Sequence, residues 1–278
     1  TRRSSDLAYT PVSNMNGTAV ITVTVSDDGG TASGGVNSTT MTFTVTVTAV
    51  NDPPTITQVS NPSAILEDAG EQTINLTGIG DGDSDLTQTI SVTATSNNTS
   101  LIPNPTVTYT SDNSTGSLAY TPVSNANGTA VITVTVSDDG DTASGGVDST
   151  TMTFTVTVTA VNDPVTLTSS IGNYTVLEDA GVSTVADLDD IFDDIDLTNG
   201  DPSALQTLSY SVVGNSNSDL ATPSIAGNGV LTVTYTSNDN GSATITVRAN
   251  DGNGSTLDES FTVTVTAVND PVTLTSSI

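Results

Sequence analysis

The fold is decided by the stretch Leu118–Asp163, LAYTPVSNANGTAVITVTVSDDGDTASGGVDSTTMTFTVTVTAVND, and the chain contains this stretch twice. The other copy, Leu7–Asp52, lies 111 residues earlier. The two copies differ at three positions only: Met15/Ala126, Gly30/Asp141 and Asn37/Asp148. Self-similarity at a fixed offset is the signature of structural repeats. We therefore expect a chain built from similar units in tandem.

Apolar and polar residues alternate with a period of two inside this stretch. Ile132, Val134 and Val136 fall on one side of an extended segment, and threonines and a serine occupy the other. The segments 41–49 and 261–265 follow the same rule. Successive side chains of a strand point to opposite faces of its sheet, so this alternation predicts strands with one face on a core and one face in water.

Clusters of Gly, Asn, Asp, Ser and Pro separate these segments, as expected for turns. No segment has a convincing period of 3.6, although Asp187–Phe192 is expected to form one short helical turn. The sequence predicts an all-β fold of tandem seven-stranded Greek-key β-sandwiches arranged end to end. Within one unit the strands are expected near 54–59, 73–79, 89–95, 106–110, 117–121, 130–137 and 151–161.

The tripeptide Asn-Asp-Pro marks the joints between the predicted units, because it recurs at Asn51, Asn162 and Asn269. We expect the C-terminal part of a repeat at 1–52, full repeats at 53–163 and 164–270, and the start of a further repeat at 271–278. Residues 269–278 have the same sequence as residues 162–171, so we interpret the chain as a piece of a longer protein.

Composition excludes several functions. The chain has 31 acidic residues, three arginines, no lysine, histidine or cysteine, and a net charge of −28. Nucleic acids and anionic membrane surfaces are bound through Lys and Arg, so neither is an expected partner. Sites of the Ser-His-Asp or Cys-His type and disulfides have no residues to form them. No apolar run reaches the roughly 20 residues of a membrane span.

Carboxylates recur at matching places in the units. Leu-Glu-Asp-Ala occurs at Leu66 and Leu177, and acidic loops follow at Asp81–Asp83 and Asp138–Asp139. Loops after alternate strands collect at one end of a sandwich, so these groups are expected to meet near the Asn-Asp linkers. Calcium needs six to eight oxygen ligands of this kind. Turn formation and solubility are the alternative roles for the same residues. Since no copy is singled out, we do not interpret the carboxylate pairs as a glycosidase and predict no enzymatic activity.

The run VTVSDDG…STTMTFTVTVTAVNDPP, with LEDAG and DGDSD, resembles the cadherin-like tandem repeats of bacterial surface and adhesin proteins. The resemblance covers essentially the whole chain and implies Ca²⁺ between consecutive domains. The implied ligands at the first joint are Asn51, Asp52, Asp81, Asp83 and Asp139. Those at the second joint are Glu67, Asn162, Asp163, Asp194, Asp196 and Asp251, while Glu178, Asn269 and Asp270 would face a further repeat.

This chain departs from the family pattern at two places. Alanine stands two positions before each linker asparagine, where the family has an acidic residue, at Ala49, Ala160 and Ala267. The glutamate pair before the sixth strand is replaced by residues 124–127, SNAN. Fewer ligands imply fewer ions or weaker binding, in the range of extracellular modules.

The function that follows is an extracellular, cell-surface role in structure and adhesion. The repeats would form a stiff stalk or fibre, with calcium stiffening the joints. Neighbouring repeats of the same chain are the first expected partners, followed by other copies and surface glycans or proteins. One alternative is a glycan- or protein-binding module, favoured by the longer, acidic segment 187–201. Another is a self-assembling filament, since residues 7–50 form only the last strands of a sandwich and another chain can supply the missing ones.

Overall fold

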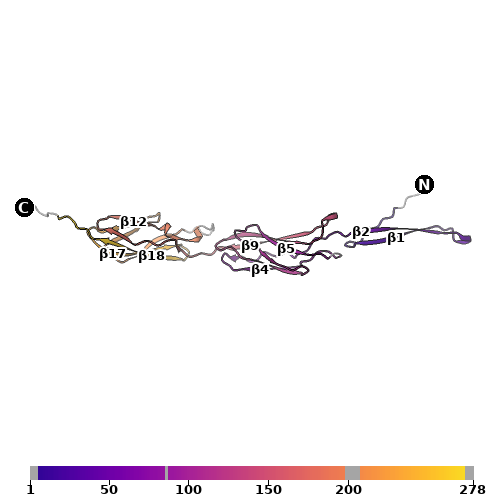
Figure 1. Ribbon diagram of the computed structural model, residues 1–278, viewed down its shortest axis with the longest axis horizontal. Helices are drawn as coiled ribbons and strands as arrows, with labels where there is room; N and C mark the ends of the chain where they lie inside the picture. Colours follow the sequence, from indigo (N-terminus) through magenta and orange to yellow (C-terminus); the bar gives the residue numbers. More distant parts are fainter. Residues whose placement is uncertain (1–5, 85–86, 198–206, 273–278) are drawn as a thin grey trace, which may run out of the picture. The chain divides into compact units, whose positions relative to one another are not determined.

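The computed structural model describes residues 6–84, 87–197 and 207–272, and strands dominate this part of the chain (Figure 1). The early strands are β1 (Gly17–Ser26), β2 (Ser38–Val47), β3 (Ile65–Leu66), β4 (Gln72–Thr77), β5 (Ser91–Ser96), β6 (Thr106–Thr108), β7 (Thr115–Tyr120), β8 (Gly128–Ser137) and β9 (Ser149–Thr159). The later strands are β10 (Thr166–Leu167), β11 (Tyr174–Leu177), β12 (Val182–Asp187), β13 (Phe192–Asp193), β14 (Ser209–Asn215), β15 (Ala221–Ile225), β16 (Val230–Tyr235), β17 (Gly241–Asn250) and β18 (Thr256–Thr266).

Helical structure in the described residues is limited to the 3₁₀ turns η1 (Ala32–Gly34), η2 (Ala143–Gly145), η3 (Leu188–Asp190) and η4 (Ile195–Leu197). None of these is long and apolar enough to cross a membrane. The predicted all-β class is confirmed. By compactness the chain divides into two units. The first comprises residues 1–64, 69–123 and 129–157, and the second comprises 65–68, 124–128 and 158–278.

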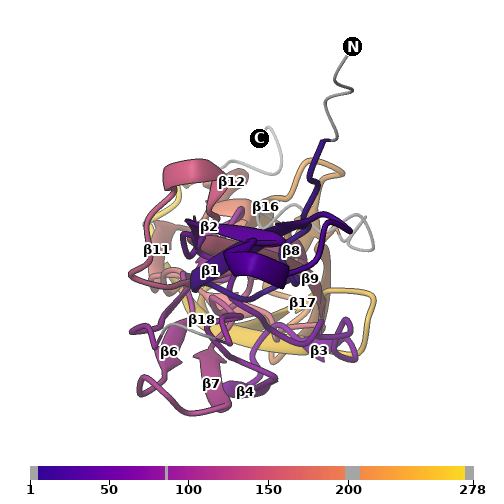
Figure 2. The same cartoon turned by 90° about the vertical axis from the view of Figure 1, so that its right-hand side faces the viewer.

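The first sandwich consists of the sheets β3-β9-β8-β5 and β4-β7-β6. Figure 2 shows β4, β7 and β6 next to one another. The core is formed by the side chains that the alternation selects: Ile132, Val134 and Val136 of β8 are fully buried, as is Val156 of β9. Leu118 of β7 joins them from the opposite sheet. The threonines between the apolar residues of β9 lie in more accessible positions.

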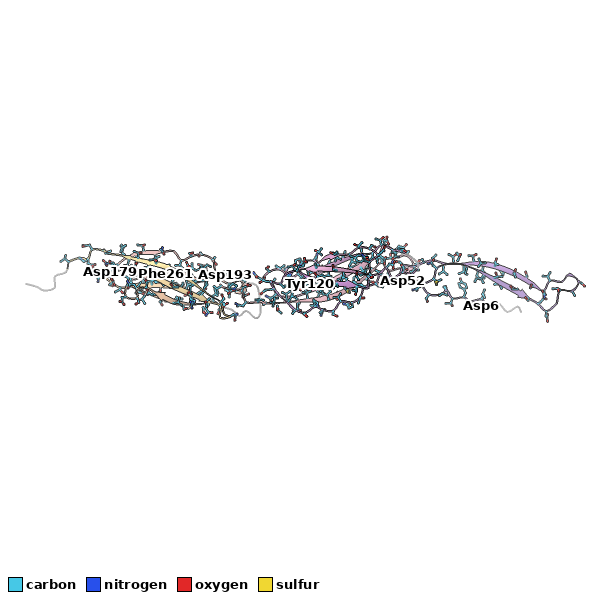
Figure 3. All side chains as sticks on the ribbon, turned by 90° about the horizontal axis from the view of Figure 1, so that it is seen from below. Asp6, Asp52, Tyr120, Asp179, Asp193 and Phe261 are labelled. Carbon is cyan, nitrogen blue, oxygen red and sulfur yellow. The ribbon has the colours of Figure 1, made fainter. Side chains whose placement is uncertain are left out.

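The second sandwich repeats this plan with the sheets β11-β18-β17-β14 and β12-β16-β15. Phe261 of β18 lies in its core, and Figure 3 shows Asp179 and Asp193 towards opposite ends of this sandwich. A short ladder joins β10 to β13 through Thr166↔Asp193 and Leu167↔Phe192. It places the start of the 193–197 segment beside the residues that follow the Asn162 linker.

Of two local predictions, the strand at 54–59 is wrong and the helical turn within 187–192 is confirmed. The predicted strand at 54–59 is wrong, since this segment forms only an isolated bridge between Thr55 and Gly80. The prolines at 53 and 54 donate no N–H, so pairing begins at Thr55 and continues only through the N–H of Thr57, 2.8 Å from the Thr77 carbonyl. The helical turn predicted within 187–192 is confirmed as η3, capped by Asp187, which accepts a hydrogen bond from the Asp189 N–H at 3.2 Å.

The first copy of the repeated stretch forms a hairpin. β1 and β2 pair from Gly17↔Val47 to Ser26↔Ser38, and within the described residues they pair only with each other. Their apolar residues are half-buried or exposed, although the same residues in β8 and β9 are buried.

Candidate functional site

Glu67 sits in a buried position that the backbone ladder creates. β3 pairs in parallel with the end of β9, and the Glu67 N–H continues this ladder by donating to the Thr159 carbonyl at 3.0 Å. The side chain then turns back, and its Oε1 accepts a hydrogen bond from the Val161 N–H at 2.7 Å. Glu67 is 0% exposed, and its Oε2 is buried with no hydrogen bond from any described residue.

Two further carboxylates approach Glu67. The Asp163 N–H donates to Asp196 Oδ2 at 2.8 Å, which ties the Asn-Asp linker to η4. Asp196 is itself 4% exposed, and its N–H donates to Asp194 Oδ1 at 3.0 Å. Glu67, Asp163 and Asp196 each offer a carboxylate oxygen, and these atoms lie within 4.8 Å of one another. We call these three residues the acidic cluster.

The acidic cluster concentrates negative charge that no basic side chain of the described residues offsets. Their one basic residue, Arg248, lies on the exposed face of β17 and binds Asp258 at 2.6 Å. Burial, together with the neighbouring Asp196 and Asp68 carboxylates, raises the pKa of Asp163. Burial also raises the pKa of Asp194, with added repulsion from Asp196, Asp251 and Asp163. Ionisation at this place is therefore disfavoured in the protein alone.

Asp251 holds the linker in place. Its Oδ1 accepts hydrogen bonds from the N–H groups of Asn253, Gly254 and Ser255 at 2.8–3.0 Å. Its Oδ2 accepts one from the Asn162 amide at 3.0 Å. Burial opposes ionisation of Asp251, but these hydrogen bonds outweigh it and lower its pKa. Asp251 thus acts as an anchor for Asn162, one residue before the acidic cluster.

The first Asn-Asp linker has a different environment, closed by amides. The Asn51 Nδ2 donates to Asp138 Oδ1 at 3.1 Å and to the Val147 carbonyl at 2.8 Å. The buried Gln88 Nε2 donates to Asp83 Oδ2 at 2.8 Å and to Asn51 Oδ1. A chain of hydrogen bonds therefore runs from the Asp83 carboxylate through the amides of Gln88 and Asn51 to the Asp138 carboxylate. We call these four residues the amide cluster.

Several predicted ligands of the first joint lie apart from this centre. Asp139 is exposed, and its carboxylate accepts a hydrogen bond from the Thr89 N–H at 2.7 Å, which lowers its pKa. Asp81 lies near Tyr109, whose pKa is raised by burial and then by acidic neighbours that include Asp81. Asp52 reaches the amide cluster with its backbone, as its N–H lies 3.4 Å from Asp83 Oδ2; Figure 3 labels it.

Sequence reasoning missed two members of the amide cluster. Asp138, rather than its neighbour Asp139, contacts Asn51, because the strand β8 ends at Ser137 and the next residue still points toward the linker. Gln88 carried no signal, since it lies outside the acidic and Asn-Asp motifs that mark the predicted ligands. The charge pattern also gave no means of separating two adjacent aspartates.

The last predicted set repeats part of the acidic cluster. Glu178 is buried, its N–H donates to the Thr266 carbonyl at 2.9 Å, and its Oε1 accepts from the Val268 N–H at 2.6 Å. These contacts are equivalent to those that Glu67 makes with Thr159 and Val161, one repeat further along the chain. Asn269 and Asp270 are exposed, with 3.5 Å between the Asn269 amide and the Asp270 carbonyl. From residue 273 on, the predicted further repeat lies outside the described residues.

The acidic cluster fits a divalent cation. Its donor set is made of hard oxygens, and two of them, Glu67 Oε2 and Asp163 Oδ2, are buried without a hydrogen bond from the described residues. Buried polar atoms are normally satisfied, so two such atoms among like charges point to a missing positive partner. Oxygen ligands of this type suit Ca²⁺ or Mg²⁺ better than softer metals.

The second sandwich also has an open pocket of about 680 Å³, lined by residues that include Asp189, Phe192 and Tyr210. The Tyr210 hydroxyl donates to Asp189 Oδ1 at 2.8 Å, and its ring centroid lies 5.9 Å from that of Phe192. Residues 198–201 of the acidic segment 187–201, which favours a binding module, lie outside the described residues. The binding-module alternative stays a prediction.

Comparison with known proteins identifies the fold. No protein-family model and no curated protein matches this sequence. A structure of protocadherin gammaB7 EC3-6, described as a cis-dimer, has a TM-score of 0.52 at 18% identity, covering 90% of this chain and 58% of its own. Protocadherin gamma B2 domains 1–5 have a TM-score of 0.52 at 16% identity, and the match covers 91% of this chain and 46% of theirs. Mouse cadherin-23 EC22-24 has a TM-score of 0.50 at 18% identity, and the match covers 90% of this chain and 74% of that structure. The chain therefore has a cadherin-like fold and spans under two thirds of the first two neighbours.

Proposed function

We propose that this chain is part of an extracellular, adhesive repeat protein whose consecutive repeats are tied together by Ca²⁺ at the acidic cluster. The observation that carries the proposal is the convergence of Glu67, Asp163 and Asp196 within 4.8 Å, with two buried oxygens left without a hydrogen bond. The cadherin-like fold supports it, and a sequence without His or Cys cannot form Ser-His-Asp or Cys-His catalytic sites.

The origin of the three residues explains what a cation would do. By the predicted bounds, Glu67 and Asp163 belong to the repeat 53–163 and Asp196 belongs to the repeat 164–270. In the structure all three lie in the second compact unit, which includes residues 65–68. A cation held by all three would couple the two repeats and remove the repulsion among the carboxylates. When bound, the ion supplies positive charge and ordered coordination. Asp251 contributes by fixing Asn162, and the Asp194 carboxylate contributes by orienting the Asp196 backbone.

We expect the amide cluster to bind calcium more weakly than the acidic cluster. The amide hydrogens of Gln88 and Asn51 lie between its two carboxylates and offset part of their charge, although Gln88 Oε1 and Asp138 Oδ2 are also buried there without a hydrogen bond from the described residues. The second joint of this chain would then depend on calcium more than the first. Tandem repeats with such joints would serve as a stalk that holds adhesive surfaces away from the cell.

Small-angle scattering with calcium and with chelator tests the function. We expect the maximum dimension to be longer and better defined in calcium, and the Glu67→Gln variant to resemble the chelated protein under both conditions. Glu178→Gln is the matched control, because it alters the aligned glutamate outside the acidic cluster. Identical profiles for the native protein in calcium and chelator would contradict the calcium-tied stalk.

A further inference from the structure

One short motif occupies the turn that leads into the first long strand of each hairpin. It is Ser-Asn-x-Asn-Gly, and it stands at residues 13–17, 124–128 and 237–241. The first asparagine of each turn has a positive φ, and the closing glycine is the first residue of β1, β8 or β17. The second asparagine is therefore followed in every copy by a glycine, which has no Cβ to shield its backbone nitrogen.

The turn before β8 is bonded to the segment that carries Glu67. The Asn125 N–H donates to Asp68 Oδ1 at 3.3 Å, and Asp68 follows Glu67 in the chain. Burial, and then repulsion by Asp196 and Asp68, raises the pKa of Asp163, so Asp68 lies near the acidic cluster. The turn and the acidic cluster also belong to the same compact unit. A new carboxylate in this turn would therefore add to the charge around the acidic cluster.

The second asparagine of this turn, Asn127, has an amide that little holds in place. The residue is half-buried, and its Nδ2 is buried with no hydrogen bond to any described residue. A buried donor without a partner is unfavourable, so the loss of this group as ammonia relieves a cost. Gly128 is exposed and is the first residue of β8, where a strand ladder opens most readily. Its N–H is therefore within reach of a base from solvent.

We propose that Asn127 is a site of spontaneous deamidation, which adds a carboxylate near the acidic cluster. The Gly128 nitrogen loses its proton to hydroxide and attacks Cγ of Asn127, an intramolecular reaction that needs no enzyme. A bond forms between this nitrogen and Cγ, the bond from Cγ to Nδ2 breaks, and Nδ2 leaves as ammonia after taking up a proton from water. Water then opens the resulting succinimide ring at either carbonyl, which leaves aspartate or isoaspartate. No group is oxidised or reduced, and the modified turn carries a negative charge that it lacked.

Two other Asn-Gly pairs among the described residues hold the glycine nitrogen in a turn. The Gly254 N–H donates to Asp251 Oδ1 at 3.0 Å, and the buried Gly229 N–H donates to the carbonyl three residues before it at 3.1 Å. Each of these hydrogen bonds has to break before the nitrogen can attack the preceding asparagine. Asn253 and Asn228 are therefore matched controls inside the same molecule.

Peptide mapping by mass spectrometry tests the modification on the complete chain, incubated at physiological temperature and mildly alkaline pH. The Asn127 peptide should gain the mass difference between amide and acid at least about tenfold faster than the Asn253 and Asn228 peptides, the factor for a hydrogen bond that must first break. The Asn127→Gln variant should show no change at this position, because the longer side chain closes the ring far less readily. An Asn127 peptide that reacts no faster than the two controls would overturn the proposal.

A calcium titration tests the consequence, which rests on the proposed function. Calcium affinity increases with the negative charge of the site, so the aged native chain and the freshly made Asn127→Asp variant should both bind a few-fold more tightly than the fresh native chain. Aged Asn127→Gln should bind as it does when fresh. Equal affinity of the fresh native chain and Asn127→Asp would contradict the effect on the joint. A fresh native chain that binds no calcium would refute the proposed function and leave the mass shift to decide the modification.

Discussion

Replacing Glu67 by glutamine should change stability in opposite directions with and without calcium. Glutamine has nearly the shape of glutamate, and its Oε1 can still accept the Val161 N–H that lies 2.7 Å from the native oxygen. Without cation, the substitution removes two of the three repulsive pairs in the acidic cluster. At 4.8 Å, the largest separation within the acidic cluster, and with an effective dielectric constant of about 20, each ionised pair costs about 3.5 kcal/mol, so the two pairs cost about 7 kcal/mol before screening. Water and local relaxation leave an expected gain of about 1–3 kcal/mol.

With calcium the sign reverses. Glutamine offers a neutral ligand oxygen in place of a charged one, and calcium affinity follows the number of charged ligands. We expect binding to weaken by about 10–100-fold, a loss of about 1.4–2.8 kcal/mol at the site. The variant should therefore be more stable than the native protein after chelation and less stable in calcium.

Hydrogen exchange by mass spectrometry measures both effects locally, which matters because a chain with several units does not unfold as one two-state system. Peptides that cover residues 65–68 and 161–168 should exchange more slowly in metal-free Glu67→Gln than in metal-free native protein. Glu178→Gln, which keeps the corresponding bond to Val268, should change little. If Glu67→Gln exchanged faster than the native protein in both conditions, Glu67 would be a structural hydrogen-bond acceptor only, and the electrostatic reasoning would be refuted.

Three more predictions concern the clusters. Gly140→Ala should reduce the free energy of unfolding of the first sandwich by about 1–3 kcal/mol, seen as a lower melting temperature, because a Cβ there collides with the amides of the amide cluster. The equivalent change in the first copy, Gly29→Ala, should be near neutral, because its Cβ meets one side-chain oxygen at 3.2 Å. Gln88→Glu should destabilise metal-free protein by about 2–3 kcal/mol and strengthen calcium binding at the first joint, as measured by calorimetry; unchanged stability would contradict the role of its amide. The raised folded-state pKa of Asp163 favours the protonated group, so this contribution to stability is complete below the unfolded pKa of about 4 and is lost as pH rises through the folded value. The metal-free second unit should therefore become more stable, seen as slower hydrogen exchange, when the pH falls from 7 toward 4, and calcium should abolish this gain. Below pH 4 the gain should reverse, because Asp251, whose pKa is lowered, becomes protonated.

The fold was largely predictable because the signal lies in long, strictly alternating strands. The residues placed on the inner face, such as Ile132 and Phe154, are the ones that are buried. Short pairings escaped prediction, since β3 has two residues and no room for a pattern. The segment at 54–59 has strand-like composition, but of its backbone N–H groups those of Thr55 and Thr57 pair with the neighbouring segment, and the prolines at 53 and 54 have no N–H to donate.

The candidate site was predictable at the level of segments and not of contacts. Glu67 and Asp163 stand out because they recur in order beside the repeated linker. Whether a given carboxylate faces the linker depends on where the preceding strand ends, as Asp138 and Asp139 illustrate. The amide cluster depends on a neutral side chain, Gln88, which brings no charge pattern to read.

A crystal grown in calcium and measured for anomalous scattering would test the central claim most directly. The account predicts an anomalous peak with oxygens of Glu67, Asp163 and Asp196 at calcium distances of about 2.3–2.6 Å, stronger than any peak at the amide cluster of the first joint. A fully ordered acidic cluster without a peak at saturating calcium would contradict it.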